Sequence, residues 1–389
     1  MNSMIEQVYS IPDMIRDSLD QFDDGIRRTL DHNFCLSLKR IFLTGCGDSH
    51  HASLNTELAF ESLAGLPTEP LTALQFARYT APYLPDTGPG TNGVIGVSVS
   101  GEVARTLEAL LLARRVGATT IALTATPGSR VAEAGDFKVY STTAPFPEKE
   151  GDHTPGIRSF TANQLALYLI AIRIGEVRGK LTSAEAATAR QELLALAEAA
   201  KKAIPAWDKI ARDLAQAWAE AQEFVFVGGG PNFGTALFSA AKVLEASGDV
   251  ALGQDTEEWA HLQYFARTIP TPTILITAGE RDLSRMLEVA TAAKAIGRRL
   301  AAVFPSDLAE GDKEHRLVET VQFIFPLPQG THEVFSPLLT TLPGSLIAAH
   351  RAEVVGESFF RNFTGGRDIS GGGGISRIRT SEIIIGVQP

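Results

Sequence analysis

Short apolar runs alternate with longer amphipathic stretches along most of the 389-residue chain. Apolar runs bounded by turn residues are typical of buried strands, and the longer stretches repeat with the period of a helix. We predict strands at Ile41–Thr44, Gly93–Val99, Thr119–Ala125, Phe137–Tyr140, Phe224–Val227, Thr273–Thr277, Arg299–Phe304 and Val321–Phe325, and helices at Ser49–Leu63, Glu102–Val116 and Arg281–Ile296. This alternation favours an α/β fold with parallel sheets that helices cover on both faces.

The two halves of the chain resemble each other. The segment FLTGCGDSHHASL from Phe42 is echoed by FVGGGPNFGTAL from Phe226, and SVSGEVARTLEALL from Ser98 by ITAGERDLSRMLEV from Ile276. Such long matching segments indicate a duplicated domain, the alternative being a chance likeness of two strand–turn–helix units. Between residues 157 and 222 the pattern is helical, and Pro205 is predicted to divide it, because a proline breaks the helical hydrogen-bond ladder.

Composition narrows the class of protein. Hydrophobic residues make up 44% and charged residues 21% of the chain, and the net charge is −10, so a nucleic acid is not an expected partner. Cys35 and Cys46 are too few for a disulfide framework. The first residues lack the pattern of a signal peptide, and no long uncharged apolar run predicts a membrane span. We therefore expect a cytoplasmic protein that does not contact membranes.

Ser98, Ser100 and Gly101 lie where a predicted strand gives way to a helix. Ligands of parallel sheets bind beyond the carboxyl ends of the strands, where helix N-terminal N–H groups attract anions. The two hydroxyls and the glycine therefore predict an anion pocket, to which the turn Gly47-Asp48-Ser49 contributes a further hydroxyl. The alternative is that the serines only cap the helix. The second copy has Ile276-Thr277-Ala278 instead, so the first half is the better candidate.

Known glycine motifs do not fit this chain. It contains neither a P-loop nor a Gly-x-Gly-x-x-Gly fingerprint, so we predict no nucleotide and no cofactor. Glu258 and His261 have the Glu-x-x-His spacing of di-metal carboxylate sites, but a second pair is not evident, and we predict no metal.

Four segments together resemble the tandem sugar-isomerase (SIS) family: GCGDS, SVSGE, GPNFGTALFSAAKVLE and GQDTEEWAHL. That family includes the isomerase half of glucosamine-6-phosphate synthase, fructoselysine-6-phosphate deglycase and ketose-isomerase/deaminase enzymes. The resemblance implies two tandem SIS domains, each a flavodoxin-like three-layer sheet, with a C-terminal tail. The expected boundaries are a helical segment at 1–40, SIS domains at 41–180 and 223–356, a helical connector at 181–222, and a Gly-rich tail at 357–389.

The resemblance also implies roles for single residues. Ser49, Ser98 and Ser100 match positions that hold the sugar phosphate, Glu245 matches the general base, and Lys242 its neighbouring lysine. His261 matches the histidine of ring opening, which in the synthase comes from a neighbouring subunit. The expected pocket is further lined by Gly47, Asp48, Gly101, Arg158, Ser159 and Glu258, with Arg377 or Arg379 in the place of a tail lysine.

These roles suit the chemistry. Aldose–ketose isomerisation needs one base to move a proton between two carbons through an enediol(ate), and a lysine three residues earlier on the same helix face can stabilise the developing oxyanion. The alternative for Lys242 and Glu245 is a surface ion pair of little consequence, and for His261 a structural histidine. The family resemblance favours the catalytic roles.

Three departures from the family pattern limit the resemblance. Val99 and Val103 replace residues that can donate to phosphate, and Asp48 replaces a threonine, so that its carboxylate would repel a phosphate. The run Gly371–Gly374 in the tail is either a lid or a spacer, and Arg377 cannot serve as a base. A sulfonated or unphosphorylated sugar remains an alternative ligand.

The sequence therefore predicts a phosphosugar isomerase, or a deaminase or deglycase of an amino-sugar phosphate, with Glu245 as base. The alternative is a sugar-phosphate-binding regulator without catalysis. A homodimer is expected, because His261 would complete the pocket of its partner. A monomer with its site between its own halves is the alternative.

Overall fold

A computed structural model gives the fold, and it describes residues 2–84, 88, 90–147, 153–267, 270–311, 317–367 and 379. Two compact units divide the chain, each built from separate stretches. Unit 1 comprises Met1–Pro12, Phe146–Ile157 and Ala195–Asn362; unit 2 comprises Asp13–Pro145, Arg158–Leu194 and Phe363–Pro389. Helices α1 (Ser3–Thr29) and α8 (Ser183–Ala217) contribute residues to both units.

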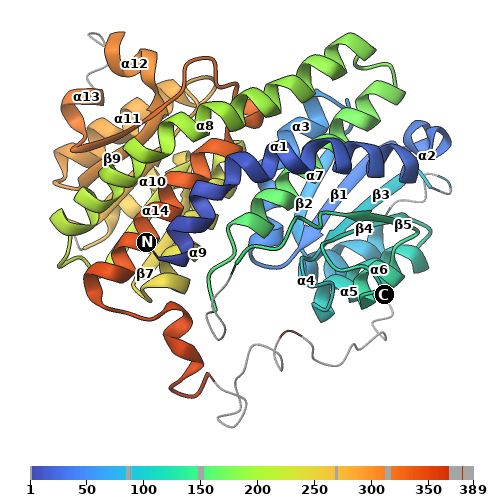
Figure 1. The fold of residues 1–389 in the computed structure, drawn as a ribbon, viewed down its shortest axis with the longest axis horizontal. Helices are drawn as coiled ribbons and strands as arrows, with labels where there is room; N and C mark the ends of the chain where they lie inside the picture. Colours follow the sequence, from blue (N-terminus) through green and yellow to red (C-terminus); the bar gives the residue numbers. More distant parts are fainter. Residues whose placement is uncertain are drawn as a thin grey trace. The chain divides into compact units, whose positions relative to one another are not determined.

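Unit 2 contains the first parallel sheet, whose strand order is β2-β1-β3-β4-β5 (Figure 1). Its elements are α2 (His32–Ser37), β1 (Arg40–Gly45), α3 (Asp48–Ser62), β2 (Thr68–Thr72), α4 (Ala73–Gln75), η1 (Phe76–Thr80), η2 (Ala81–Tyr83), β3 (Asn92–Val97), α5 (Ala104–Arg115), β4 (Thr119–Thr124), α6 (Arg130–Ala134), β5 (Phe137–Tyr140) and α7 (Arg158–Val177). Helices cover both faces of this sheet: a Cβ on Gly45 would lie 2.7 Å from Ser49 of α3, and one on Gly96 would lie 2.8 Å from Leu110 of α5.

Unit 1 contains the second parallel sheet, in the order β10-β9-β8-β6-β7. Its elements are β6 (Glu223–Gly228), α9 (Pro231–Ala246), β7 (Val250–Asp255), α10 (Thr256–His261), η3 (Gln263–Phe265), β8 (Pro272–Ile276), α11 (Leu283–Ala295), β9 (Arg299–Pro305), α12 (Ser306–Gly311), α13 (Leu317–Thr320), β10 (Phe323–Leu327), η4 (Glu333–Phe335), α14 (Pro337–Val355) and η5 (Phe359–Phe363), which ends at the first residue of unit 2. In both sheets the first strand is second from an edge and the third strand lies on its other side, which is the flavodoxin-like order. The predicted α/β class, with two tandem parallel sheets, is confirmed.

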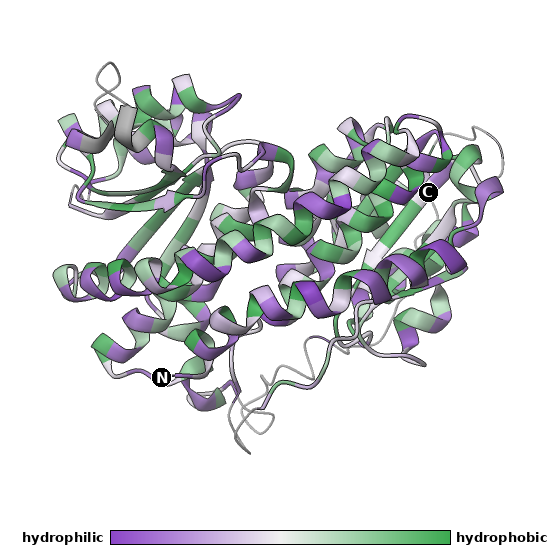
Figure 2. Ribbon diagram, turned by 45° about the horizontal axis from the view of Figure 1, so that its top comes forward, coloured by the Kyte–Doolittle hydropathy of each residue, from purple (hydrophilic) through white to green (hydrophobic). Residues whose placement is uncertain are grey.

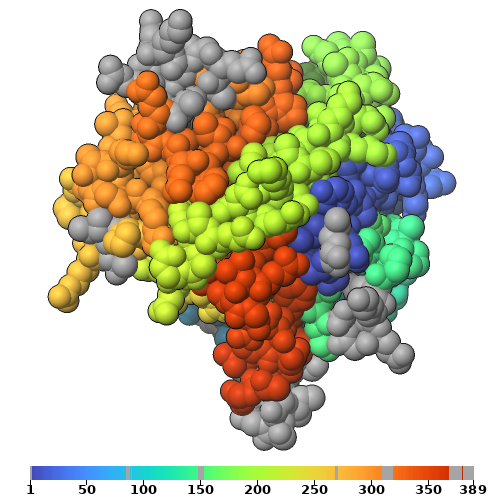
Figure 3. All heavy atoms as spheres, turned by 60° about the vertical axis from the view of Figure 1, so that its left-hand side comes forward, coloured from blue at the N-terminus to red at the C-terminus, as the bar shows by residue number. Residues whose placement is uncertain are grey.

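The cores form where the sequence pattern places them. Strands of both sheets are mostly hydrophobic, whereas the covering helices show hydrophobic and hydrophilic faces (Figure 2). In unit 1, Val225, Val227 and Leu275 pack with Trp259 of α10 and Met286 of α11. On the surface of this unit α8 runs beside α14 (Figure 3), and Asp208 Oδ1 lies 2.6 Å from His350 Nε2.

All eight predicted strands are present, with ends shifted by no more than a few residues, but the sequence prediction lacked β2 and β7. Both of these are edge strands. β2 is the polar segment Thr68-Glu69-Pro70-Leu71-Thr72, and an edge is where a sheet tolerates a proline.

The predicted break at Pro205 is wrong, because α8 continues through it. Pro205 is exposed, while Ile204 and Trp207 are buried. The buried side chains of one helix face therefore outweigh the cost of a proline inside a helix, which is about 3 kcal/mol. The helical region is interrupted instead at residues 178–182, between α7 and α8. Among the described helices, none is both long enough and apolar enough to cross a membrane.

Candidate functional site

Ser98 directly follows β3 at the carboxyl edge of the first sheet. Ser98 is 1% exposed, and its hydroxyl has no hydrogen-bond partner among the residues that the structure describes. The backbone around it is fixed, because Ser98 N–H donates to Leu123 O at 3.0 Å and Ala125 N–H donates to Val99 O at 3.1 Å. Since a buried hydroxyl without a partner is costly, this position fits a ligand that supplies the missing acceptor.

Neither serine caps α5. That helix begins at Ala104 rather than at Glu102, and its N-cap residue is Val103, whose side chain cannot accept a hydrogen bond. The Ser100 hydroxyl accepts from the Glu102 N–H at 3.3 Å instead, and the Ser100 side chain is exposed. The alternative that Ser98 and Ser100 only cap the helix is therefore wrong, and the first N–H groups of α5 have no side-chain cap.

Gly101 is required by the close approach of a neighbouring loop. Its φ is +67°, and a Cβ at this position would lie 1.8 Å from Ser129 Oγ. Its carbonyl accepts from the Val131 N–H at 2.9 Å. Gly101 thus joins the loop after β3 to the loop after β4, and holds both at the carboxyl edge.

The turn after β1 brings α3 to the same edge. Gly47 adopts a φ of +55° just before α3, and no side chain caps this helix. A Cβ on Gly45 would lie 2.7 Å from Ser49 Cβ and 3.0 Å from Val97 O, so α3 begins close to the ends of β1 and β3. Ser49 is buried in the first turn. Two uncapped helix N-termini therefore follow neighbouring strands, which is the arrangement that binds anions.

Three titratable residues occupy the first turn of α3. Asp48 Oδ1 lies 3.8 Å from His51 Nδ1. Burial, together with His51 beside it, lowers the pKa of His50 to about 4, so His50 is neutral at pH 7. The Nδ1 atoms of both histidines are buried and have no hydrogen-bond partners within the described ranges. The sequence prediction included Asp48 but not the histidines, although the adjacent pair directly after Ser49 was a visible signal.

Arg158 and Ser159 begin α7, also in unit 2. Arg158 Nη2 donates to Ala144 O at 3.4 Å, in the segment that follows β5. Burial lowers the pKa of Arg158, but a guanidinium remains charged at neutral pH. Unit 2 therefore places Arg158 beside the segment that leaves the carboxyl end of β5, in the same sheet whose β1 and β3 precede Ser49 and Ser98.

The equivalent turn in unit 1 contains a carboxylate. Thr277 Oγ1 donates to Asp282 Oδ1 at 2.5 Å, and Gly279 N–H donates to Thr277 Oγ1 at 2.9 Å. Burial raises the pKa of Asp282 to about 6, and the Glu333 carboxylate contributes to the rise. A protein carboxylate at this turn opposes an anionic ligand. The expectation that the first half, and not the second, holds the anion stays a prediction.

Lys242 and Glu245 lie one turn apart on α9. The Lys242 side chain is fully buried, and its ammonium contacts the Glu245 carboxylate and lies 5.0 Å from the centre of the Phe238 ring. The Glu245 side chain is 26% exposed. The alternative of a surface ion pair is therefore wrong for Lys242. A buried ammonium needs such a partner, because an unpaired buried charge is costly.

His261 and Glu258 are on the surface of unit 1. His261 Nε2 lies 3.0 Å from Glu257 Oε1, and its side chain is 66% exposed. The Glu258 N–H is capped by Asp255 Oδ1 at 3.3 Å, and Glu258 is exposed. Both side chains are therefore exposed on unit 1 rather than buried inside it. Within the described ranges, no group of three or more His, Cys, Asp and Glu side chains is arranged to hold a metal ion.

The predicted site residues thus divide between the units. Unit 2 holds Gly47, Asp48, Ser49, Ser98, Ser100, Gly101, Arg158 and Ser159, and unit 1 holds Lys242, Glu245, Glu258 and His261. Arg377 and Gly371–Gly374 lie outside the described residues.

Comparison with known proteins agrees with this architecture. Residues 36–173 match the model of the SIS domain. The glutamine–fructose-6-phosphate aminotransferase (isomerizing) of Gloeobacter violaceus is 31% identical over 357 residues, which cover 90% of this chain and 55% of that relative. The chain thus spans about half the length of the curated relatives it matches.

Solved structures share the fold over nearly the whole chain. The C-terminal domain of glucosamine-fructose-6-phosphate aminotransferase from Francisella tularensis has a TM-score of 0.77 and 19% identity, covering 91% of this chain and 96% of that one. Tagatose-6-phosphate ketose/aldose isomerase from Escherichia coli has a TM-score of 0.70 and 16% identity, covering 93% and 95%. Residues 36–173 therefore match a SIS domain, and the same strand order is repeated in the second half of the chain.

Proposed function

We propose that this protein is an aldose–ketose isomerase of a phosphosugar, or a deaminase or deglycase of an amino-sugar phosphate. The observation that carries the proposal is the buried, unpartnered hydroxyl of Ser98, which lies at a sheet edge followed by two uncapped helices. That edge supplies hydroxyl and N–H donors to an anion. The relatives named above act, by their names, on fructose 6-phosphate and tagatose 6-phosphate.

Glu245 is the proposed base. Its carboxylate is partly exposed and can reach a substrate, while the buried ammonium of Lys242 beside it can stabilise negative charge on the enediolate oxygen. One carboxylate that removes a proton from one carbon and returns it to the next completes the isomerisation without a cofactor.

Asp48 affects the charge that the proposed anion site accepts. The Asp48 side chain, 27% exposed in the first turn of α3, adds negative charge at the proposed anion site. This favours, as a second candidate, a sugar of lower charge, either sulfonated or unphosphorylated.

We further propose that the active form is a homodimer. The exposed imidazole of His261, held by Glu257, is available to a partner subunit. Dilution that dissociates the dimer should remove activity, and a fully active monomer would exclude this arrangement.

The decisive experiment follows deuterium exchange. The protein is incubated in D₂O with hexose 6-phosphates and hexosamine 6-phosphates, and deuterium at C1 or C2 is measured by NMR. We expect exchange with one of these sugars, loss of exchange in Glu245→Gln with ligand binding retained, and no change in Glu198→Gln, a control at an exposed glutamate. Wild-type protein that binds a sugar without exchange is a regulator rather than an isomerase.

A further inference from the structure

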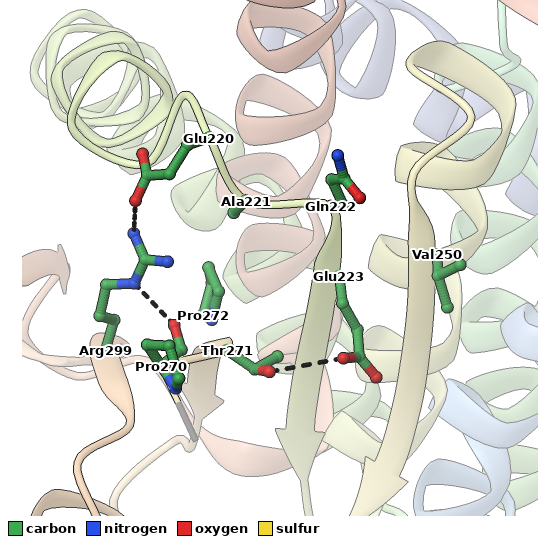
Figure 4. Close-up of a pocket in the computed structure, with 9 residues that line it drawn as sticks. All are labelled: Glu220, Ala221, Gln222, Glu223, Val250, Pro270, Thr271, Pro272 and Arg299. Carbon is green, nitrogen blue, oxygen red and sulfur yellow. Dashed lines mark hydrogen bonds and ion pairs between the residues drawn. The ribbon is translucent and has the colours of Figure 1, made fainter. Parts of the chain in front are cut away.

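An open pocket of about 520 Å³ lies at the opposite edge of the second sheet, where the strands begin (Figure 4). It is lined by Glu220, Ala221, Gln222, Glu223, Val250, Pro270, Thr271, Pro272 and Arg299. These residues precede or begin β6, β7, β8 and β9. None of the residues assigned above to sugar binding or catalysis lines this pocket, and its volume is in the range that holds a small molecule.

The walls of this pocket are fixed from behind by Arg351 of α14. Its buried guanidinium donates to Ala219 O at 2.6 Å and to Asp249 Oδ2 at 2.7 Å, and it also contacts the Ala221 carbonyl. These contacts hold the segment before β6 and the residue before β7 in place. A pocket with walls held in this way is formed before any ligand arrives, which lowers the entropic cost of binding.

Arg299 supplies one side of the pocket. Its Nη1 pairs with Glu220 Oε1 at 2.5 Å, and its Nε donates to Pro270 O at 2.6 Å. The remaining terminal nitrogen, Nη2, has no hydrogen bond to any of the described residues, and Figure 4 shows it pointing away from Glu220 towards Pro272. A guanidinium that is oriented by two hydrogen bonds and keeps one donor unused is suited to a carboxylate.

Glu223 supplies the opposite charge. Its Oε2 accepts a hydrogen bond of 3.4 Å from Thr271 Oγ1, while its second oxygen has no hydrogen bond within the part of the chain that is described. Val250, 56% exposed, and the two prolines add apolar surface. Because Glu220 already neutralises Arg299, a simple anion would be repelled by Glu223, and a simple cation would leave the Arg299 donor unused.

We infer that this pocket binds a free α-amino acid. Its carboxylate accepts from Arg299 Nη2, its ammonium donates to Glu223, and an aliphatic side chain packs against Pro272 and Val250. The site is independent of the proposed sugar chemistry and would stand if that proposal failed.

Calorimetric binding of three matched probes tests this inference: L-leucine, 3-methylbutylamine, which lacks the carboxylate, and 4-methylpentanoate, which lacks the amine. We expect leucine to bind at least roughly tenfold more tightly than either analogue, because each analogue loses one charge-assisted hydrogen bond. Equal binding of the amine and leucine, or no binding of leucine at tens of millimolar, would overturn the inference.

Two variants and one control locate the site. Arg299→Met should weaken leucine binding while leaving binding of the amine unchanged, and the isosteric Glu223→Gln should weaken both. Arg16→Met, which removes an exposed arginine paired with Asp13 and Asp17, should change neither. Circular dichroism confirms that each variant is folded. Leucine affinity that survives both Arg299→Met and Glu223→Gln places the amino acid elsewhere and refutes the assignment.

Discussion

Thr277 donates a 2.5 Å hydrogen bond to Asp282 across a turn in the second half of the chain. The corresponding turn in the first half contains Ser98, whose hydroxyl has no hydrogen-bond partner among the described residues. The duplicated fold therefore has two different chemistries at the same place. In the second half a carboxylate of the chain itself satisfies the hydroxyl. In the first half, the proposed ligand would do so.

Ser98→Ala should remove binding energy without harming the fold. Its hydroxyl has no hydrogen-bond partner in the part of the protein that the structure describes, so the free energy of unfolding should stay the same or rise. A lost hydrogen bond to a charged ligand should lower kcat/KM by roughly 10- to 100-fold. Steady-state kinetics and thermal unfolding measure the two effects. Ser62→Ala, whose hydroxyl donates to Leu58 O, is the control and should leave kcat/KM unchanged.

Asp48→Thr should tighten the binding of inorganic phosphate or a sugar phosphate. It removes a like charge from the first turn of α3, and the expected gain is roughly tenfold at low salt, decreasing as salt screens the repulsion. Titration calorimetry at two ionic strengths measures it, with the exposed Asp24→Asn as control. A tighter affinity for unphosphorylated sugar alone would favour the ligand of lower charge.

Lys242→Met should lower turnover far more than stability. Methionine fills the volume of the buried lysine stem, but Glu245 loses the cation that its carboxylate contacts. We expect kcat to fall by roughly 100-fold, and a double-mutant cycle with Glu245→Gln to give losses that do not add. Lys209→Met, at a 74% exposed lysine paired with Asp213, should change nothing. Additive losses of kcat would show that Lys242 and Glu245 act independently.

Asp282→Asn should change how stability depends on pH. Burial raises the pKa of Asp282 to about 6 from a usual value near 3.8, so between these values the folded state binds more protons than the unfolded state. The contribution of Asp282 is fully present below about pH 4. It is lost as the pH rises through about 6.

The asparagine keeps an oxygen for Thr277 and does not ionise. We therefore expect Asp282→Asn to gain up to about 3 kcal/mol over the wild type between pH 4 and pH 8. Urea unfolding at several pH values measures this difference. A constant difference across that range would show that the carboxylate does not titrate there.

Much of the fold follows from the sequence because buried strands have uniformly apolar side chains. β1, β3 and β6 were predicted nearly to the residue. The edge strands β2 and β7 were not predicted, because an edge strand can have polar side chains and so lacks the continuous apolar run of a buried strand. The prediction at Pro205 was wrong for a related reason. The exposed side of α8 tolerates the proline, and a rule about proline in helices takes no account of the burial of Ile204 and Trp207 beside it.

The site shows the same division. Serines and glycines at the strand ends could be predicted, since their positions follow from the topology. The burial of Lys242, the lowered pKa of His50 and the carboxylate at Asp282 depend on packing between segments far apart in the sequence. The placement of Arg377 stays a prediction.

The contact between Gly101 and Ser129 sets a limit on redesign. Since a Cβ at position 101 would collide with the serine, a substitution of Gly101 requires a simultaneous substitution of Ser129. Val99 and Val103, only partly buried on either side, carry no such restriction. A library meant to change the ligand preference of this site should therefore randomise the two valines and keep Gly101 and Ser129. The loops would then retain their backbone conformation while the side chains beside the site vary.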